Sequence, residues 1–190
     1  MFWRLIAQCG QTCCQSAGRA QEKNQVTLQL IVSRRWLLAA IGLAAFGLVA
    51  TGLVLARTLN LAACPLCILQ RMLYLALAVE SIAAFFLAHR PIAGRLTTVL
   101  MSLTALTGGG IAAYQAWLQH FAKDVSCTAD QPWWERFVYW SGEQCPWLFE
   151  ATGLCSEAGW RFLGLSIAEW SLIAFATFTI ATLTAVRSKN

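Results

Sequence analysis

Four long apolar stretches alternate with shorter polar segments along this chain. They cover about residues 36–56, 67–88, 96–118 and 167–186. Each is close to the roughly 20 residues that an α-helix needs to cross the hydrocarbon layer of a bilayer. Because a backbone in lipid must satisfy its own hydrogen bonds, we expect helices in these stretches. The pattern therefore predicts an all-α membrane protein, a bundle of four transmembrane helices with one long loop at residues 119–166.

Composition supports the same fold class. Of the 190 residues, 58% are hydrophobic and 12% are charged, whereas charged residues make up about 25% of an ordinary soluble domain. We expect one membrane domain at residues 36–190 and a short tail at residues 1–35, since little polar sequence is left for further domains. The pattern of the tail is not that of a cleavable signal peptide, because residues 8–25 are polar and the next apolar run is of full transmembrane length.

The distribution of charge predicts the orientation of the bundle. Nine basic residues precede the first stretch, separate the second from the third, or follow the fourth: Arg4, Arg19, Lys23, Arg34, Arg35, Arg90, Arg95, Arg187 and Lys189. A single acid, Glu22, accompanies them, whereas residues 120–166 hold three basic and six acidic residues. The positive-inside rule then places both termini in the cytoplasm and the loop at residues 119–166 on the outer side.

The eight cysteines divide between the two predicted sides. Three lie in the cytoplasmic tail: Cys9, Cys13 and Cys14. Reductants keep such thiols reduced, and no fourth metal ligand is nearby, so we interpret them as non-catalytic. Five lie on the outer side: Cys64, Cys67, Cys127, Cys145 and Cys155. Their confinement to the oxidising side indicates disulfide chemistry, because a purely hydrophobic use would scatter cysteines through the helices.

The sharpest motif is Cys-Pro-Leu-Cys at residues 64–67. Two residues between cysteines allow a short disulfide that is reduced more readily than a structural bridge. Pro65 favours a helix start, which places Cys67 in the first turn, where unpaired N–H groups stabilise a thiolate. Arg71 follows one turn later on the same face and adds a positive charge. The motif therefore predicts a redox-active pair at a membrane surface.

Other uses of this motif fit less well. A c-type haem site requires histidine directly after the second cysteine, where this chain has Ile68. A zinc site requires two more ligands nearby, and a thioredoxin-like motif requires a βαβ unit. A structural bridge in a loop is the remaining alternative.

The long loop combines three cysteines with many aromatic residues. Three cysteines cannot all pair with one another, so one is free or bonds elsewhere. A loop disulfide would be accessible to the thiolate of another protein, although it could equally serve only to stabilise the loop. Trp133, Phe137 and Trp140 follow i, i+4, i+7 spacing, which predicts a short amphipathic helix at the membrane interface.

Two features of the spans call for interpretation. Glu80 lies in the second stretch, about 20 Å from Cys67 by helical rise, which is too far for thiol chemistry. We interpret it as a snorkelling or bundle-facing acid, with a proton path as the alternative. Gly108-Gly109-Gly110 in the third stretch is typical of close helix packing.

Together these residues resemble the bacterial disulfide-bond formation protein B (DsbB) family, from Trp36 to the end of the chain. The segment at residues 64–71, C-P-L-C-I-L-Q-R, is similar to the active-site motif of the family. Residues 151–165, A-T-G-L-C-S-E-A-G-W-R-F-L-G-L, resemble the end of its second periplasmic loop. Residues 114–120, Y-Q-A-W-L-Q-H, resemble the end of its third helix.

The resemblance implies an oxidoreductase of the bacterial inner membrane that sustains disulfide formation in exported proteins. A reduced DsbA-like periplasmic dithiol oxidase would attack a Cys127–Cys155 disulfide at Cys127. Cys155 would then exchange with Cys64 and leave Cys67 as the thiolate that faces a quinone. Cys145 matches no cysteine of the family and could compete for either loop partner.

The resemblance also implies a cofactor site for ubiquinone or menaquinone. Arg71 matches the family's quinone-site arginine, and His120 matches a histidine near the same ring. A cation and a hydrogen-bond donor beside a quinone carbonyl would stabilise negative charge as the ring is reduced.

Two rival functions are separated by the order and position of the cysteines. In the vitamin K epoxide reductase family the loop cysteines precede the C-x-x-C motif, whereas Cys64 and Cys67 come first here. A non-enzymatic, tetraspanin-like scaffold would have no use for Arg71 one turn below Cys67.

Overall fold

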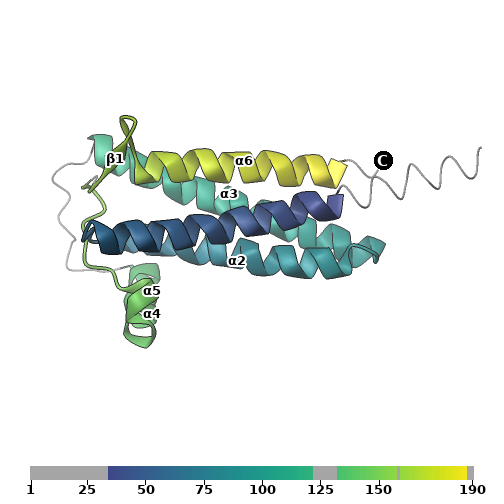
Figure 1. Ribbon diagram of the computed structural model, residues 1–190, viewed down its shortest axis with the longest axis horizontal. Helices are drawn as coiled ribbons and strands as arrows, with labels where there is room; N and C mark the ends of the chain where they lie inside the picture. The colour runs from purple at the N-terminus through teal and green to yellow at the C-terminus, as the bar shows by residue number, and fades with distance from the viewer. Residues whose placement is uncertain (1–33, 122–131, 158, 188–190) are drawn as a thin grey trace, which may run out of the picture.

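Four long helices lie side by side and form an elongated bundle in the computed structural model, which describes residues 34–121, 132–157 and 159–187 (Figure 1). They are Arg34–Thr58, α2 (Pro65–Leu87), α3 (Pro91–Phe121) and α6 (Ile167–Arg187). All four are long and apolar enough to cross a membrane. The all-α, four-helix membrane fold is therefore confirmed, and the chain is a multi-pass membrane protein.

The helices extend past the apolar stretches that predicted them. α3 begins at Pro91 and ends at Phe121, so it includes Arg95 and the first residues assigned to the long loop. Proline suits the first position of a helix because its missing N–H group has no intrahelical acceptor there, and Pro65 opens α2 in the same way. A hydropathy pattern locates only the apolar part of a helix, whereas the helix itself ends at its caps.

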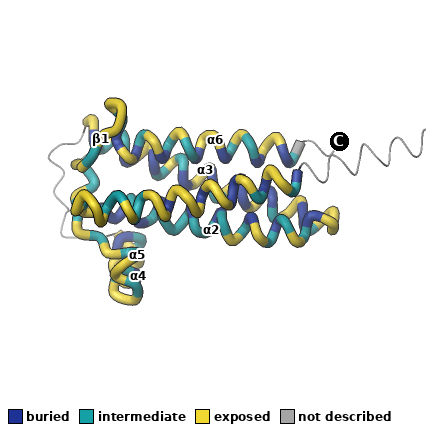
Figure 2. Tube along the Cα trace, viewed as in Figure 1, coloured by how far each residue is buried: buried dark blue, intermediate teal, exposed yellow. Residues whose placement is uncertain are grey.

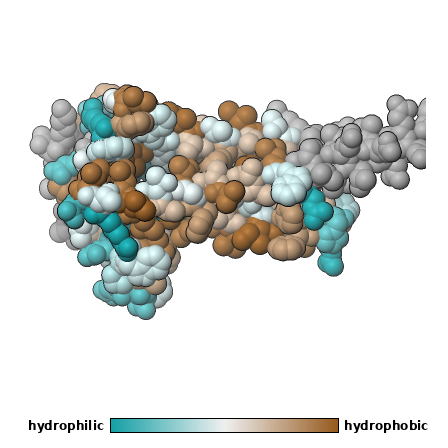
Figure 3. All heavy atoms as spheres, in the orientation of Figure 1, coloured by the Kyte–Doolittle hydropathy of each residue, from teal (hydrophilic) through white to brown (hydrophobic). Residues whose placement is uncertain are grey.

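Side chains from all four helices build the core. Its largest fully buried residues include Leu38 of the first helix, Leu77 of α2, Met101 of α3 and Phe175 of α6. Many large apolar side chains point outward instead, among them Leu43, Phe86 and Ile180. Buried positions follow one side of each helix in Figure 2, and the apolar exposed side chains form a belt between two more polar ends in Figure 3. This is the surface expected of helices surrounded by lipid.

Close packing of α3 on α6 depends on one glycine. The ring of Tyr74 on α2 stacks on Phe175 with 4.2 Å between centroids and 3° between planes. A Cβ atom at Gly108 would lie 2.3 Å from Cε1 of Phe175. The prediction that glycines in this helix allow close packing is thus confirmed at Gly108, whereas Gly110 has nothing within 4 Å of such an atom.

The long loop contributes short elements at one end of the bundle (Figure 1). These are α4 (Trp133–Gln144), α5 (Pro146–Phe149), and a two-stranded hairpin of β1 (Arg161–Phe162) and β2 (Leu165–Ser166). The hydrophobic pattern of the sequence did not predict the hairpin. Its turn residues, Leu163 and Gly164, have φ values of 52° and 84°, as a two-residue turn between antiparallel strands requires.

The short amphipathic helix predicted in this loop is α4. Trp133, Phe137 and Trp140 are all exposed along one side of it, whereas Val138 and Ser141 are buried on the other. The aromatic stripe therefore points away from the protein. Such a stripe is typical of a helix that lies in a membrane interface.

Two charged side chains of the spans, Glu80 and Arg34, form hydrogen bonds inside the bundle. Glu80 is half-buried, and its Oε1 accepts a hydrogen bond of 2.8 Å from Thr104 of α3, so it faces the bundle. At the end opposite the hairpin, buried Arg34 donates to the carbonyl of Gly94 and to Thr98 Oγ1. These bonds tie the first helix to α3.

Candidate functional site

Cys64 and Cys67 occupy the start of α2, as their spacing around Pro65 predicted. Cys64 is the N-cap residue, with extended backbone angles of −85° and 161°, and its Sγ accepts a hydrogen bond of 3.3 Å from the Cys67 N–H. The two sulfur atoms lie 3.0 Å apart. Cys64 is only 3% exposed. The pair is therefore held in register for exchange by the helix start itself.

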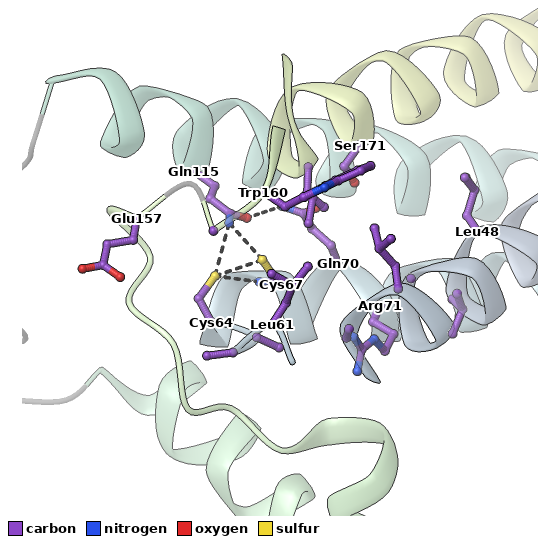
Figure 4. A pocket seen from close by; sticks show the side chains of 18 of the residues that line it. Leu48, Leu61, Cys64, Cys67, Gln70, Arg71, Gln115, Glu157, Trp160 and Ser171 are labelled. Carbon is purple, nitrogen blue, oxygen red and sulfur yellow. Dashed lines mark hydrogen bonds between the residues drawn. The ribbon is translucent and has the colours of Figure 1, made fainter. Parts of the chain in front are cut away.

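A buried glutamine of α3 binds both sulfur atoms. Gln115, which is 1% exposed, donates from Nε2 to Cys64 Sγ at 3.2 Å and to Cys67 Sγ at 3.0 Å (Figure 4). Its Oε1 accepts a hydrogen bond of 2.7 Å from Nε2 of Gln70, one turn below Cys67 on α2. The amide of Gln115 thus presents its donor end to the thiols.

The loop brings a third cysteine to this pair. Thr152 and Gly153 both donate their N–H groups to the carbonyl of Ala63, each at 2.9 Å. This attachment directly before Cys64 carries Cys155 to the pair, and the side chain of Cys155 hydrogen-bonds that of Cys64. Two segments that are about ninety residues apart in sequence therefore meet at one sulfur atom.

This contact gives the two thiols opposite acidities. The hydrogen bond with Cys155, a second one with Cys67, and burial raise the pKa of the Cys64 thiol above its ordinary value of 9.0. The same bond from Cys64 lowers the pKa of Cys155 below 9.0, with a backbone hydrogen bond from Leu66 acting in the same direction. Burial and the nearby charge of Glu135 oppose that shift without reversing it. Of these two thiols, Cys155 therefore ionises first, and Cys64 keeps its proton.

The remaining predicted site residues are not gathered at these sulfurs. Cys127 lies outside the described residues. Cys145 lies half-buried at the junction of α4 and α5, and the described cysteines Cys64, Cys67, Cys145 and Cys155 are all free. His120, in the last turn of α3, is paired with Glu169 of α6 at 3.0 Å between Nε2 and Oε1. Glu169 in turn accepts from the N–H of Ser166 at 2.6 Å, which caps α6.

A cavity of about 160 Å³ opens beside Cys67. Apolar residues of the first helix form one wall, including Val49 and Gly52. Polar groups come from the other three helices and from the loop. They are Arg71 and Gln70 of α2, Gln115 and Gln119 of α3, Ser171 of α6, and Glu157 and Trp160 of the loop. An apolar cavity of about 150 Å³ is large enough for a benzene ring. The space next to Cys67 is therefore about the size that holds one six-membered ring.

Arg71 reaches this cavity from the turn below Cys67, as its spacing predicted. It is half-buried, and its Nη1 donates a hydrogen bond to the carbonyl of Leu148 on α5. The bond fixes the guanidinium between the bundle and the loop elements. His120 does not belong to the lining of the cavity.

Sequence reasoning missed three glutamines of this site: Gln70, Gln115 and Gln119. Each lies in or at the end of an apolar stretch, where a polar side chain is costly unless it has a partner. Gln115 and Gln119 are also four residues apart, which places them on one helix face. That spacing was the available signal.

The arrangement is suited to thiol–disulfide exchange. Cys155, Cys64 and Cys67 lie in series, and exchange requires a thiolate to approach a sulfur of the next pair. The ring-sized cavity lies beside Cys67, the last cysteine of this series. Among the described residues, no group of three or more histidines, cysteines and acids is placed to hold a metal ion.

Comparisons with known proteins agree with this chemistry. The family model described as "Disulfide bond formation protein DsbB" matches residues 34–185. Disulfide bond formation protein B of Dechloromonas aromatica is 43% identical over 147 residues, which cover 75% of this chain and 86% of that protein. The protein of the same name from Herminiimonas arsenicoxydans is 31% identical over 157 residues, 82% of this chain and 98% of its own length. The chain belongs to the disulfide bond formation protein B (DsbB) family, and its role is that of a membrane oxidoreductase in disulfide bond formation.

Proposed function

We propose that this protein reoxidises a DsbA-like dithiol oxidase of the periplasm and passes the electrons through two cysteine pairs to a membrane quinone, either ubiquinone or menaquinone. The observation that carries the proposal is the position of the Cys64–Cys67 pair. Cys64 hydrogen-bonds Cys155 of the loop on one side, and Cys67 lines a ring-sized cavity on the other. The pair therefore lies between a site that protein thiols can reach and a site open to a lipid-soluble acceptor.

The loop pair receives the electrons in two exchanges. A thiolate of the partner attacks Cys127 of a Cys127–Cys155 disulfide, so that a mixed disulfide forms and Cys155 leaves as a thiolate. The second thiol of the partner then attacks the mixed disulfide, which releases an oxidised partner and leaves Cys127 reduced. Two electrons and two protons have moved from the partner to the loop.

The inner pair accepts the electrons by the same chemistry. The Cys155 thiolate attacks Cys64 of a Cys64–Cys67 disulfide, and Cys67 leaves as a thiolate. Cys127 then attacks Cys155, which restores the loop disulfide and frees Cys64. The contact between Cys155 and Cys64 supports this direction because it brings the attacking sulfur next to the sulfur that it attacks. Gln115 supports it as well, since its donor end stabilises charge on either sulfur of the inner pair.

The cavity provides the site for the final acceptor. When bound there, a quinone would take up two electrons and two protons as the inner pair returns to a disulfide. The residues fit such a ring: the walls are largely apolar, Arg71 offers a cation, and the buried Oε1 of Gln119 has no hydrogen-bond partner. The role of His120 near the ring, which the resemblance implies, stays a prediction. His120 is paired with Glu169 and is not among the residues that line the cavity.

We also propose that the end of the bundle with the cysteines faces the periplasm of the bacterial inner membrane and that both termini, with the tail at residues 1–35, are cytoplasmic. Four arginines support this orientation because they lie at the start of the first helix and around the connection from α2 to α3, at the end of α2 opposite to its cysteines: Arg34, Arg35, Arg90 and Arg95. The exposed aromatic side of α4 would then lie in the outer interface and hold the loop close to Cys64.

The test uses purified protein in lipid nanodiscs with a bound quinone and a reduced DsbA-like protein as the electron donor. Quinone absorbance is followed in the wild type and in C67S, C127S and C145S variants. We expect turnover to be abolished in the first two variants. We expect it to stay within about twofold in C145S, because no disulfide joins Cys145 to Cys64, Cys67 or Cys155 in the structure. Normal turnover in C67S or C127S would exclude the relay. A mixed disulfide trapped on Cys145 would make that residue the first one attacked.

A further inference from the structure

The loop that brings Cys155 to Cys64 also forms part of the cavity beside Cys67. Among the described residues, those of the loop that line this cavity flank Cys155 on both sides in the sequence: Leu154, Glu157, Gly159 and Trp160. The rest of the lining comes from the four long helices and from residues 61–64. One segment of the loop therefore contributes both to the thiol contact and to the wall of the cavity.

This segment is attached to the bundle at two places. Its start is hydrogen-bonded to the carbonyl of Ala63, directly before Cys64. At its end, Trp160 stacks on Phe162 of β1, with 5.7 Å between centroids and 12° between planes. The carbonyl of Phe162 in turn accepts a hydrogen bond of 3.1 Å from Nε1 of Trp170 on α6. The hairpin thus holds Trp160 near α6, whereas the other end of the segment depends on the attachment at Ala63.

A ring in the cavity would contact two apolar side chains of this segment. Leu154, the residue directly before Cys155, is 50% exposed and lines the cavity. Trp160 lines it as well, and in Figure 4 its indole extends from the loop toward Ser171 of α6. A bound ring would cover apolar surface of both side chains, which favours binding because that surface leaves water and because aromatic rings stack well.

Such contacts link ring binding to the position of Cys155. A ligand that contacts the loop only while the loop lies against the bundle stabilises that arrangement. Coupling of this kind is reciprocal, so a loop that is held against the bundle also binds the ring more tightly. Leu154 and Cys155 are neighbours in the sequence, so a ring that holds the first also holds the second.

We propose that Leu154 and Trp160 are part of the acceptor site and that a ring bound there holds Cys155 against Cys64. The inference rests on the proposed function, because it takes a quinone as the occupant of the cavity. Attack of Cys155 on Cys64 releases Cys67 as a thiolate beside the same cavity. The coupling therefore favours this exchange when an acceptor is present to receive the electrons.

The test measures the binding of short-chain ubiquinone and short-chain menaquinone by equilibrium dialysis in nanodiscs. The parent protein for this test has serine at every cysteine except Cys64 and Cys155. Its bridged form carries the Cys64–Cys155 disulfide and is freed of unbridged protein on a thiol-reactive resin. Its unbridged form carries the further substitution C155S, which also removes a thiol that could reduce the ring.

Gly153→Ala tests the coupling, because it displaces the loop although Gly153 does not line the cavity. We expect its unbridged form to bind the ring about fivefold more weakly than the unbridged parent, at the lower end of the usual coupling between two sites. The bridge should restore the affinity of the parent, since it holds Cys155 at Cys64. Thr152→Ala, the matched control, should leave affinity unchanged in both forms.

The outcomes separate this coupling from the proposed function. Equal affinity of unbridged Gly153→Ala and the unbridged parent would overturn the coupling. So would a loss that the bridge does not restore, because the damage would then lie in the bundle and not in the position of the loop. If the parent binds neither quinone in either form, the proposed acceptor itself is wrong.

Leu154→Ala and Trp160→Ala test the contacts with the ring. Both should weaken binding by about threefold or more in the bridged form, where the loop cannot leave Cys64, because less apolar surface is covered. Leu163→Ala and Trp117→Ala make the same substitutions at exposed side chains outside the lining and should leave affinity unchanged. Normal binding in Leu154→Ala or in Trp160→Ala would overturn the place of that residue in the acceptor site.

Discussion

Gln70 Nε2 donates a hydrogen bond of 2.7 Å to Gln115 Oε1, and this bond between α2 and α3 decides which end of the Gln115 amide faces the sulfurs. Without it the amide could rotate and turn its oxygen toward Cys64 and Cys67. An acceptor there would repel a thiolate, whereas the donor that is present stabilises one. Gln70 therefore acts on the thiols through Gln115.

Replacement of Gln115 by leucine should slow reduction of the acceptor by the inner pair by about tenfold or more, because hydrogen bonds to charged groups contribute about 1.5–3 kcal/mol. Gln70→Leu should have a smaller effect in the same direction. In the double variant the two effects should not add, since Gln70 has no route to the sulfurs once Gln115 is lost. Stopped-flow measurement of quinone absorbance in all three variants tests this. Additive effects would show that the two residues act separately.

The opposite acidities of Cys155 and Cys64 predict how each thiol reacts with an alkylating reagent as pH rises. Cys155 has a lowered pKa and should reach half of its maximal labelling rate below pH 9.0. Cys64 has a raised pKa and should stay slow beyond pH 9.0. Peptide mass spectrometry of the fully reduced protein, labelled for short times over a pH series, measures both.

Two variants separate the effects that lower and raise the pKa of Cys155. Cys64→Ala removes the hydrogen bond that is its largest cause and leaves burial in place, so the labelling midpoint of Cys155 should move to higher pH. Cys67→Ala removes a charge that raises the same pKa, so the midpoint should move to lower pH. Shifts of the same sign in both variants would contradict the contact between Cys155 and Cys64.

The sequence predicts most of the fold because local rules determine it. Hydropathy locates the four spans, Pro65 starts α2 next to Cys64, and the spacing of Trp133, Phe137 and Trp140 predicts α4. The hairpin was not predicted because its only sequence signal is the Leu163-Gly164 turn, and the flanking residues show no alternation of hydrophobic and polar positions.

The site was less predictable, since it depends on contacts between distant segments. The spacing of Cys67 and Arg71 predicted that both lie on one face of the same helix, and in the structure both line the cavity. No rule of residue spacing predicts that Cys155 lies next to Cys64. Only the resemblance to the family led us to expect this contact. A glutamine in an apolar stretch indicates that a partner exists, but the partners of Gln115 are two sulfurs and a side chain of another helix.

Gly108→Ala should destabilise the bundle by about 1–3 kcal/mol, the usual range for overpacking a core. The added Cβ would lie 2.3 Å from the Phe175 ring, which cannot move freely because it is stacked on Tyr74. Gly110→Ala is the matched control on the same helix. It meets no atom within 4 Å and should leave stability unchanged or raise it by up to about 1 kcal/mol, because alanine favours a helix. Unfolding in mixed micelles of increasing denaturing detergent measures both, and equal destabilisation would contradict the packing at Gly108.

Gly153→Ala should separate the loop from the inner pair without touching any thiol. A Cβ atom at this position would lie 2.5 Å from the carbonyl oxygen of Ala62, so the loop has to move away from the segment before Cys64. The N–H groups of Thr152 and Gly153 would then lose Ala63 as their acceptor, and Cys155 would lose its contact with Cys64. Since a displacement of about 1 Å can slow a positioned reaction by up to about a hundredfold, we expect exchange between the two pairs to slow by about tenfold or more.

Thr152→Ala is the matched control for this prediction. Its side chain is exposed, and its attachment to Ala63 is made by the backbone, which the substitution leaves intact. In a background with C67S and C127S, the fraction of protein that forms a Cys64–Cys155 bridge in a glutathione redox buffer reports the contact directly, without any partner or quinone. That fraction should fall in Gly153→Ala and stay at the parent level in Thr152→Ala. If it stays high in Gly153→Ala while turnover falls, the loop acts by a route other than placing Cys155 against Cys64.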